Sequence, residues 1–418
     1  MKIVHRWVAL VALVAVVAVL LDGGARAASD DWARAALTSR PSAPIPVQAL
    51  ALPGVPEVWA VDETVGRVIV VTTPGYESGK HTITFLDGST GRIIVSLPFS
   101  ENSNYPNDLS VDRQRHHVLA VADGEIDTFD TRTGRQLHAA HVPSQPFSLA
   151  MDSASGRAYA GDMSGKNDMI VLDTRTGAII KSVYFRPSVL GATEIDPIAV
   201  NKQGDVFLLT DQKPAIVNER GTILHHIPLS VGNVGAYDSR RDRAVLVGGS
   251  ANLTTAYTID GVDGRVETAA PIATNSEFFP ASILILDSRS GRTVLEQLPS
   301  TKGSSGRFVH LFDDRTGRRT ASMTIRTPDG IGESTSKDAA IINHDTGHVL
   351  LLLEEDPFTP PAYLQVLDGT TGHVLTTIRL DESSAYSLPS IAIDYRTHHL
   401  YISSSDTGSV SVFDSRCL

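Results

Sequence analysis

The sequence predicts an all-β protein whose short strands repeat in units of four. One repeated turn carries most of this prediction: an apolar strand ends in Asp, three further residues follow, and Gly precedes the next strand, as in Asp130-Thr-Arg-Thr-Gly134. Asp accepts hydrogen bonds from the amides that follow it and Gly adopts the positive φ that closes the turn, so the pattern is typical of a hairpin loop. Copies that start at Asp87, Asp130 and Asp173 lie 43 residues apart (87 to 130 and 130 to 173), a spacing typical of a four-stranded repeat.

A second turn recurs between the copies of the first, and each kind occurs eight times. The copies of the first turn begin at Asp87, Asp130, Asp173, Asn218, Asp260, Asp313, Asp368 and Asp414. The copies of the second begin at Asp62, Asp112, Asp152, Asn201, Asp238, Asp287, Asn343 and Asp394. Because two independent registers give the same count, the sequence predicts eight units.

Residues 107–142 show how the two turns divide one unit into strands a, b, c and d. The expected strands are Leu109-Ser-Val111, Val118-Leu-Ala-Val121, Ile126-Asp-Thr-Phe129, and the run from Gln136 to Val142. Each is short and bounded by turn residues, as strands of a repeated sheet are. The second turn joins strand a to strand b, so we call it the a–b turn, and the first becomes the c–d turn.

The two ends of the chain complete the pattern. Residues 390–413 supply strands a, b and c and stop where strand d is due, whereas Val47-Gln-Ala-Leu-Ala-Leu52 is a strand without a unit of its own. An array of such sheets must close, because open sheet edges promote aggregation. We therefore expect residues 45–418 to form an eight-bladed β-propeller of four-stranded antiparallel blades, with the N-terminal strand completing the last blade. Seven blades is the alternative, if residues 273–337 do not form a full blade.

The last unit also has a specific signature. Ile391-Ala-Ile-Asp-Tyr-Arg-Thr-His-His-Leu-Tyr-Ile-Ser403, followed by Gly408-Ser-Val-Ser-Val-Phe-Asp414, resembles the YVTN-type repeat of bacterial exported β-propellers. The resemblance covers residues 45–418 and implies the propeller fold; most such propellers have seven blades, so eight would be a departure. The family includes surface proteins, quinoprotein dehydrogenase subunits, lactonases and a streptogramin lyase. No motif of the enzymatic members can be placed on this sequence.

The N-terminus predicts export. Lys2 and Arg6 precede an apolar run over residues 7–21, and Ala25-Arg-Ala27 matches a cleavage site, so residues 1–27 form an expected signal peptide. An uncleaved membrane anchor is the alternative. Residues 28–44 are an expected linker, because prolines interrupt them and their apolar residues follow no period. We therefore expect a periplasmic or extracellular protein that has no membrane contact after cleavage.

The composition narrows the classes of partner. A formal net charge of −11 argues against a nucleic-acid surface. The only cysteine is Cys417, which excludes an intramolecular disulfide and a cysteine metal cluster. We expect a monomer, and no cofactor motif is evident.

The candidate binding residues lie in the connections that precede strand a. In a propeller, strand a lines the central channel, and the d–a and b–c connections meet on one face, which we call the top face. Acidic residues just before a strand a therefore surround the channel mouth, namely Asp108, Glu194, Asp196, Glu277 and Asp338. Four loop aromatics are expected near the same mouth, namely Tyr105, Phe278, Phe279 and Tyr386, and of these Tyr105 and Phe278 are the candidate binding residues. Converging carboxylates suit Ca²⁺ or a cationic ligand, and aromatics suit a ligand platform; the alternatives are carboxylates that cap strand amides and aromatics that pack under the loops.

The other chemically suggestive groups point to structure. The c–d turn aspartates lie on the face opposite the candidate mouth, and we expect them to bind turn amides. The histidines occur as neighbours, as in His116-His117 and His398-His399, and neighbours on a strand face opposite sides, so such a pair is a poor metal clamp. His116 and His398 also occupy the turn position that is Gly in other copies.

Two functions follow from these features. The first is a non-catalytic propeller that binds a protein, peptide or carbohydrate through its top-face loops. The second is a lactonase- or lyase-like enzyme with a carboxylate or metal site at the channel mouth. A redox-partner subunit would require a second chain, since no cofactor motif exists in this one.

Overall fold

The computed structural model describes residues 47–73, 81–99, 106–122, 124–142, 146–162, 168–185, 195–210, 213–229, 231–250, 253–273, 283–297, 307–325, 340–356, 359–380, 390–403 and 408–418. They belong to one compact unit, Ile45–Leu418. The expected signal peptide (1–27) and linker (28–44) lie outside the described residues and stay predictions. The described residues include no helix long and apolar enough to cross a bilayer.

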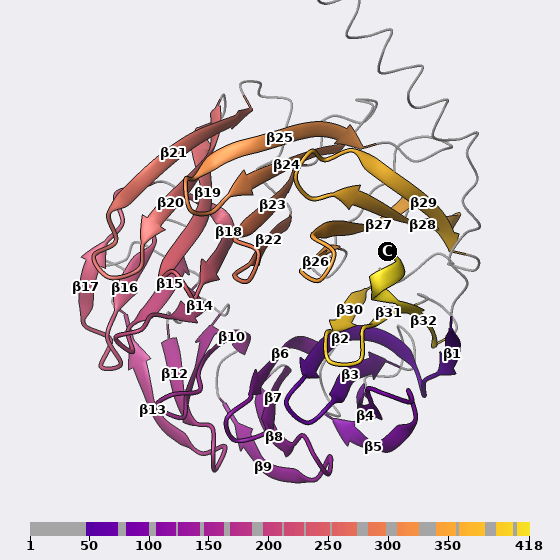
Figure 1. Cartoon of the computed structure of the whole chain (residues 1–418). Helices are drawn as coiled ribbons and strands as arrows, with labels where there is room; N and C mark the ends of the chain where they lie inside the picture. The colour runs from indigo at the N-terminus through magenta and orange to yellow at the C-terminus, as the bar shows by residue number, and fades with distance from the viewer. Residues whose placement is uncertain are drawn as a thin grey trace, which may run out of the picture. The chain divides into compact units, whose positions relative to one another are not determined.

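Eight antiparallel four-stranded sheets, which we number as blades 1 to 8, make up this unit (Figure 1). Blades 1 to 4 consist of β2(Val55–Asp62), β3(Arg67–Thr73), β4(His81–Asp87), β5(Ile93–Phe99); β6(Pro106–Asp112), β7(His117–Ala122), β8(Glu125–Asp130), β9(Gln136–His141); β10(Pro146–Asp152), β11(Arg157–Asp162), β12(Asp168–Asp173), β13(Ile179–Tyr184); and β14(Ile195–Val200), β15(Val206–Thr210), β16(Ala215–Val217), β17(Ile223–His226).

Blades 5 to 8 repeat the same order and include the sheet that settles the count. They consist of β18(Val231–Asp238), β19(Arg243–Ser250), β20(Leu253–Asp260), β21(Val266–Ala273); β22(Ile283–Asp287), β23(Arg292–Gln297), β24(Arg307–Asp313), β25(Arg318–Ile325); β26(Ala340–Asn343), β27(His348–Asp356), β28(Thr359–Asp368), β29(Val374–Leu380); and β30(Ile391–Asp394), β31(His399–Ser403), β32(Ser409–Asp414) with β1(Gln48–Ala51). A short 3-10 helix, η1(Ser415–Cys417), follows β32. Because residues 283–325 form a full blade, the prediction of eight blades is confirmed and the seven-bladed alternative is wrong.

The first strand of every blade lies innermost and contacts the first strand of the next blade. These contacts run in order from β2 through β6, β10, β14, β18, β22, β26 and β30, and β30 contacts β2 again. The sheets are therefore arranged in a closed ring around these eight strands (Figure 1). The β-propeller predicted from the two turn registers is confirmed.

The ring is latched by pairing between the two ends of the unit. β1 adds to the outer edge of blade 8 and runs antiparallel to β32, with Gln48 opposite Val412 and Leu50 opposite Val410. The Leu50 side chain packs on a buried cluster that includes Val68 of blade 1 and Tyr401 of blade 8. Blade 8 thus takes three strands from the C-terminal end of the chain and one from the N-terminal end, as the sequence predicts.

The core lies between neighbouring blades, because each sheet packs on the next. Strands b and c are buried on both faces: Val68 and Ile69 of β3 have no exposed surface, although they are neighbours in the strand. Phe85 of blade 1 lies 5.9 Å from Phe129 of blade 2, measured between ring centroids. The outermost strands instead alternate between exposed and partly buried residues, as in β13. Sheets buried on two faces account for the nearly continuous apolar runs of strands b and c.

The c–d turns form by the predicted chemistry. The Oδ1 atom of Asp368 accepts the backbone N–H groups of Thr370 at 2.8 Å and Thr371 at 2.7 Å, and Gly372 adopts φ of 76°. These backbone hydrogen bonds lower the pKa of Asp368. Asp414, in the copy at the C-terminus, hydrogen-bonds the Arg416 side chain, and this contact lowers its pKa to about 2. The prediction that these aspartates are structural is confirmed.

The latch yields the first testable prediction. Replacing Leu50 with Lys puts a charge against the apolar cluster, and we expect the free energy of unfolding to fall by about 1–3 kcal/mol. Thermal unfolding followed by circular dichroism measures the change. Ala49→Lys is the control, because Ala49 lies next to Leu50 on the same strand and is exposed. Equal midpoints for the two variants would contradict a role of β1 in closing the ring.

Candidate functional site

The structure describes two of the seven residues that the sequence places at the channel mouth, Asp108 and Asp196. The other five, Tyr105, Glu194, Glu277, Phe278 and Asp338, lie outside the described residues. Asp108 lies on β6 and Asp196 on β14, near the start of the innermost strand of blades 2 and 4. A shared site of the seven residues therefore stays a prediction.

Asp108 makes contacts that hold two blades together. Its Oδ1 atom accepts the backbone N–H of Leu109 at 2.9 Å, and its Oδ2 atom accepts that of Leu149 in blade 3, also at 2.9 Å. Asp196 is partly buried and lies opposite Leu209 in the sheet. The geometry of Asp108 agrees with the alternative of a carboxylate that caps strand amides.

The predicted Ca²⁺ site depends on residues outside the described part of the chain. Within the described ranges, no group of three or more His, Cys, Asp or Glu side chains could hold a metal ion. Three of the five carboxylates proposed for the ion, Glu194, Glu277 and Asp338, are not among those residues. A Ca²⁺ ion at the channel mouth therefore stays a prediction.

The paired histidines make structural contacts in the turns and between blades. His116 and His398 adopt φ of 57° and 59°, the left-handed conformation that Gly adopts in other copies of the a–b turn. Their neighbours reach the next blade: the Nδ1 atom of His117 donates to the carbonyl of Thr174 at 2.7 Å, and that of His399 donates to the carbonyl of Gly88 at 2.8 Å. Each pair thus shapes a turn and links two blades, as expected of structural residues.

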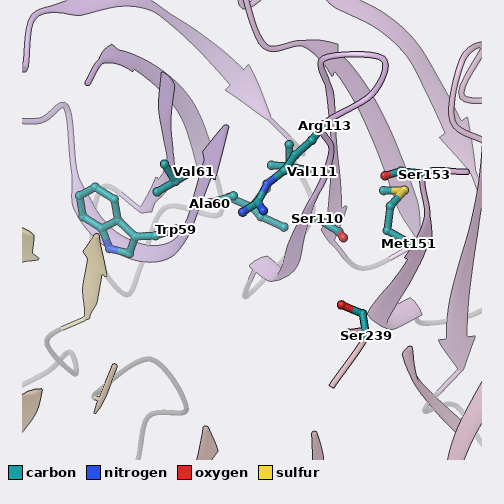
Figure 2. Close-up of a pocket in the computed structure, with 10 residues that line it drawn as sticks. Trp59, Ala60, Val61, Ser110, Val111, Arg113, Met151, Ser153 and Ser239 are labelled. Atoms are coloured by element: carbon teal, nitrogen blue, oxygen red, sulfur yellow. The ribbon is translucent and has the colours of Figure 1, made fainter. Parts of the chain in front are cut away.

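A cavity of about 450 Å³ lies on the inner face of the ring (Figure 2). Innermost strands of blades 1, 2 and 3 and three a–b turns line it, through Trp59, Ala60, Val61, Leu109, Ser110, Val111, Arg113, Met151, Ser153 and Ser239. Arg113, Ser153 and Ser239 each directly follow the aspartate that opens an a–b turn. The cavity therefore lies toward the a–b turn end of the innermost strands, whereas Asp108 and Asp196 lie toward their other end.

Sequence reasoning missed these cavity residues, although a signal for them exists. The residue after each a–b turn aspartate or asparagine varies from unit to unit, and the eight are Glu63, Arg113, Ser153, Lys202, Ser239, Ser288, His344 and Tyr395. Because they directly follow the strand that lines the channel, they lie around its end. A repeat position that keeps its place but not its residue type is the pattern expected of a functional surface.

A polar network occupies another sector of the same end. The Nη2 atom of Arg289 in blade 6 lies 3.1 Å from the Oε2 atom of Glu63 in blade 1. Its Nη1 atom donates to Nε2 of His344 at 2.5 Å, and its guanidinium lies 5.6 Å from the ring centroid of Tyr395. Burial, and then the Arg289 charge, lower the pKa of His344, which fits a neutral imidazole that accepts this hydrogen bond. The network joins the a–b turns of blades 6, 7, 8 and 1.

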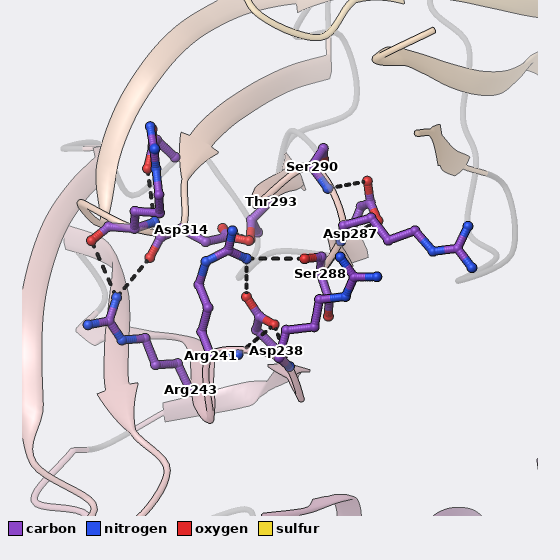
Figure 3. Close-up of polar contacts among 12 residues, drawn as sticks. Asp238, Arg241, Arg243, Asp287, Ser288, Ser290, Thr293 and Asp314 are labelled. Carbon is purple, nitrogen blue, oxygen red and sulfur yellow. Dashed lines mark hydrogen bonds and ion pairs between the residues drawn. The ribbon is translucent and has the colours of Figure 1, made fainter. Parts of the chain in front are cut away.

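The junction of blades 5 and 6 brings two carboxyl groups together (Figure 3). Arg241 donates through Nη1 to Oδ2 of Asp238 at 2.6 Å and to the Ser288 carbonyl at 3.2 Å. Asp314 is buried near this pair, and its Oδ1 atom accepts a hydrogen bond from the Thr293 hydroxyl. Burial, together with the charge of Asp238, raises the pKa of Asp314 to about 7.

Two carboxyl groups and one imidazole, each buried or partly buried and bonded within its own blade, also have strongly shifted pKa values. Burial raises the pKa of Glu57 to about 7, against a hydrogen bond from Thr73. Burial, helped by the charge of Glu125, raises that of Asp127 to about 7. Burial lowers the pKa of His310, which hydrogen-bonds Ser322, to about 4. These groups belong to blades 1, 2 and 6, so they do not suggest one catalytic constellation.

The Asp314 junction gives the second testable prediction. The folded-state pKa lies near 7 and the ordinary value is 3.8, so the stabilising contribution of this group is complete below pH 3.8 and is lost as the pH rises through 7. Thr occupies the equivalent position in blades 2 and 3, where Thr131 and Thr174 donate to Asp62 and Asp112. We expect Asp314→Thr to be more stable than the native protein at pH 8, with the gain about 1–2 kcal/mol smaller at pH 5.

Thermal unfolding at the two pH values checks this expectation. The matched control is Asp263→Asn, which removes an exposed carboxylate from the c–d turn of the neighbouring blade. If Asp314→Thr and Asp263→Asn shift the midpoint equally at both pH values, Asp314 does not hold a proton in the folded state.

Comparisons with known proteins agree with the architecture. A family model described as outer membrane protein assembly factor BamB matches residues 15–213, a little under half of the chain. A search of curated proteins gives no match.

Solved structures show the same fold at low sequence identity. The propeller of Dos1 is 11% identical, with a TM-score of 0.61, and the match covers 89% of this chain and 95% of that one. The computationally designed Ika8 protein is 14% identical, with a TM-score of 0.57, over 89% of this chain and 99% of that one. At such identities the likeness concerns the fold alone. Together with the eight blades observed here, these matches show that the chain is a repeat-built β-propeller.

Proposed function

We propose that this chain is an exported, non-catalytic β-propeller that binds a protein, peptide or carbohydrate partner through the loops of its top face. The observation that carries the proposal is the contrast between the two kinds of connection. The a–b connection of blade 2 spans residues 113–116, whereas the connection from β25 to β26 spans residues 326–339. Long connections on a rigid scaffold are typically the functional ones.

The contacts of the repeated polar residues also support this proposal. Carboxylates and imidazoles are the usual catalytic groups, and the chain carries many of them in its turns. The turn aspartates accept hydrogen bonds from backbone amides, and His117 and His399 donate hydrogen bonds to backbone carbonyls of the next blade. These groups stabilise the ring. We therefore assign the binding function to the connections of the top face.

The family resemblances support export. Residues 391–414 resemble the YVTN-type repeat of exported propellers, and residues 15–213 match a model named for an outer membrane protein assembly factor. With the signal peptide expected at residues 1–27, we place the mature protein in the periplasm or outside the cell, as a monomer. The resemblance to enzymatic propellers keeps a lactonase- or lyase-like activity with Ca²⁺ at the channel mouth as the alternative.

Partner binding gives the third testable prediction. The double variant Tyr105→Ser/Phe278→Ser removes the two aromatic residues among the proposed binding residues of the top face, and we expect it to weaken binding by at least tenfold, since aromatic anchors dominate interface energies. Purified mature protein, labelled and applied to peptide and glycan arrays, identifies a ligand, and titration then gives the affinities. Val262→Ser is the control, because Val262 is an exposed apolar residue on a c–d turn, on the opposite face.

Two results would contradict the proposal. One is equal binding by the double variant and the control. The other is turnover of a lactone or ester that depends on Ca²⁺ and is lost in Asp338→Asn, which would favour the enzyme instead.

A further inference from the structure

Arg113 is the cationic side chain of the inner cavity, and it has no partner there. It makes no hydrogen bond or ion pair with any other residue that the structure describes, and its side chain is exposed to the cavity (Figure 2). Three other arginines of a–b turns are bonded through their side chains: Arg115 to Asp112, Arg241 to Asp238 and Arg289 to Glu63. Arg113 is therefore set apart from the arginines that hold the ring together.

The carboxylates nearest in sequence are already committed to other groups. Asp112 accepts the Thr174 hydroxyl at 2.5 Å and the Arg115 guanidinium at 3.0 Å. Asp62 accepts the Thr131 hydroxyl at 2.6 Å, and Glu63 pairs with Arg289. Among the residues that the structure describes, the positive charge of Arg113 thus has no ion-pair partner, although the chain as a whole carries a net charge of −11.

The rest of the lining consists of polar groups and short apolar side chains. Ser110, Ser153 and Ser239 bring hydroxyls to the cavity, and within the described part of the chain none of these hydroxyls has a hydrogen bond. Apolar surface comes from Ala60, Val61, Leu109, Val111 and Met151, beside Trp59. Most of the accessible lining is polar, short apolar side chains lie beside it, and the partly open space of about 450 Å³ falls in the size range of small-molecule sites.

The indole of Trp59 is held in place. Its Nε1 atom donates to the Ser390 hydroxyl at 2.5 Å, and its ring centroid lies 6.1 Å from that of Tyr401. The Arg289 network joins the turns of blades 6, 7, 8 and 1. The lining residues Arg113, Ser153 and Ser239, whose side chains are unbonded among the described residues, belong to the turns of blades 2, 3 and 5. One sector of the channel end is thus cross-linked by polar contacts, and the other retains a cavity with an unpaired cation.

We propose that this cavity binds a small organic anion, a carboxylate or sulfonate with an apolar body. The anionic group pairs with the Arg113 guanidinium, whose planar fork matches such groups, and the serine hydroxyls donate to the same oxygens. The apolar body lies against Val111 and Met151. The site lies at the opposite end of the channel from the proposed partner-binding loops, so either proposal can fail alone.

The experiment uses two fluorescent probes that differ in charge. The anionic probe is 8-anilinonaphthalene-1-sulfonate, and the neutral one is N-phenyl-1-naphthylamine, the same molecule without the sulfonate. Titration into the purified mature protein gives both affinities. We expect Arg113→Met to weaken binding of the anionic probe by about tenfold or more, because a hydrogen-bonded charge is lost. Arg113→Glu is expected to abolish it, and the neutral probe should change less than twofold in Arg113→Met.

The matched control is Arg132→Met. Arg132 is also an exposed arginine of the same blade, and it lies on the c–d turn, outside the cavity lining. Circular dichroism confirms that each variant folds, which is expected because both positions are exposed. The proposal is overturned if Arg113→Met and Arg132→Met bind the anionic probe equally, or if Arg113→Met weakens both probes to the same extent.

Discussion

The ring depends on the carboxylate or amide at the end of the innermost strand, which in blades 1, 2, 4 and 7 bonds a residue of the next blade. Asp112 is fully buried, yet every oxygen has a use: Oδ1 accepts two amides of its own turn, and Oδ2 accepts the Thr174 hydroxyl of the next blade. One side chain therefore shapes the a–b turn and fixes the neighbouring sheet. Burying a carboxylate costs desolvation free energy, and this cost is tolerated only when the group is hydrogen-bonded. The hydrogen bonds that offset the cost also fix the position of one blade relative to the next.

Other junctions use a variant of this contact that depends on the residues present there. Asn201 donates through Nδ2 to the Gly261 carbonyl, and Asn343 donates to the Ser415 carbonyl. At the junction of blades 8 and 1 the Gly88 carbonyl instead accepts from His399 and the Tyr401 hydroxyl. A Cβ on Gly88 would approach Oδ2 of Asp394 to 2.2 Å, so the missing side chain lets the two turns pack. Since each sheet packs on its two neighbours in the ring, these variations remain local, as in other repeat proteins.

At the a–b turn end of the channel, equivalent positions of the eight repeats carry different residue types. The residue that follows the structural Asp needs no fixed type, because the turn is made by its neighbours. Arg113 and Ser153 at this position line the cavity, whereas Glu63 and His344 join the Arg289 network. The fold thereby separates residues that the frame constrains from residues that can acquire a function, in accord with the view that function is grafted onto folds.

The sequence by itself determined the strands, the two turn registers, the count of eight and the closure by residues 47–52, because each rests on local chemistry: Asp that binds the following amides, Gly with positive φ, and apolar runs of strand length. The tertiary structure alone decided which distant side chains meet. Glu63 and Arg289 are far apart in the chain, and no periodicity relates Trp59 to Ser239 across the inner face. Closing a ring brings eight turns around one axis, so the choice between a bonded arginine such as Arg289 and an unpaired one such as Arg113 depends on which neighbours the closure provides.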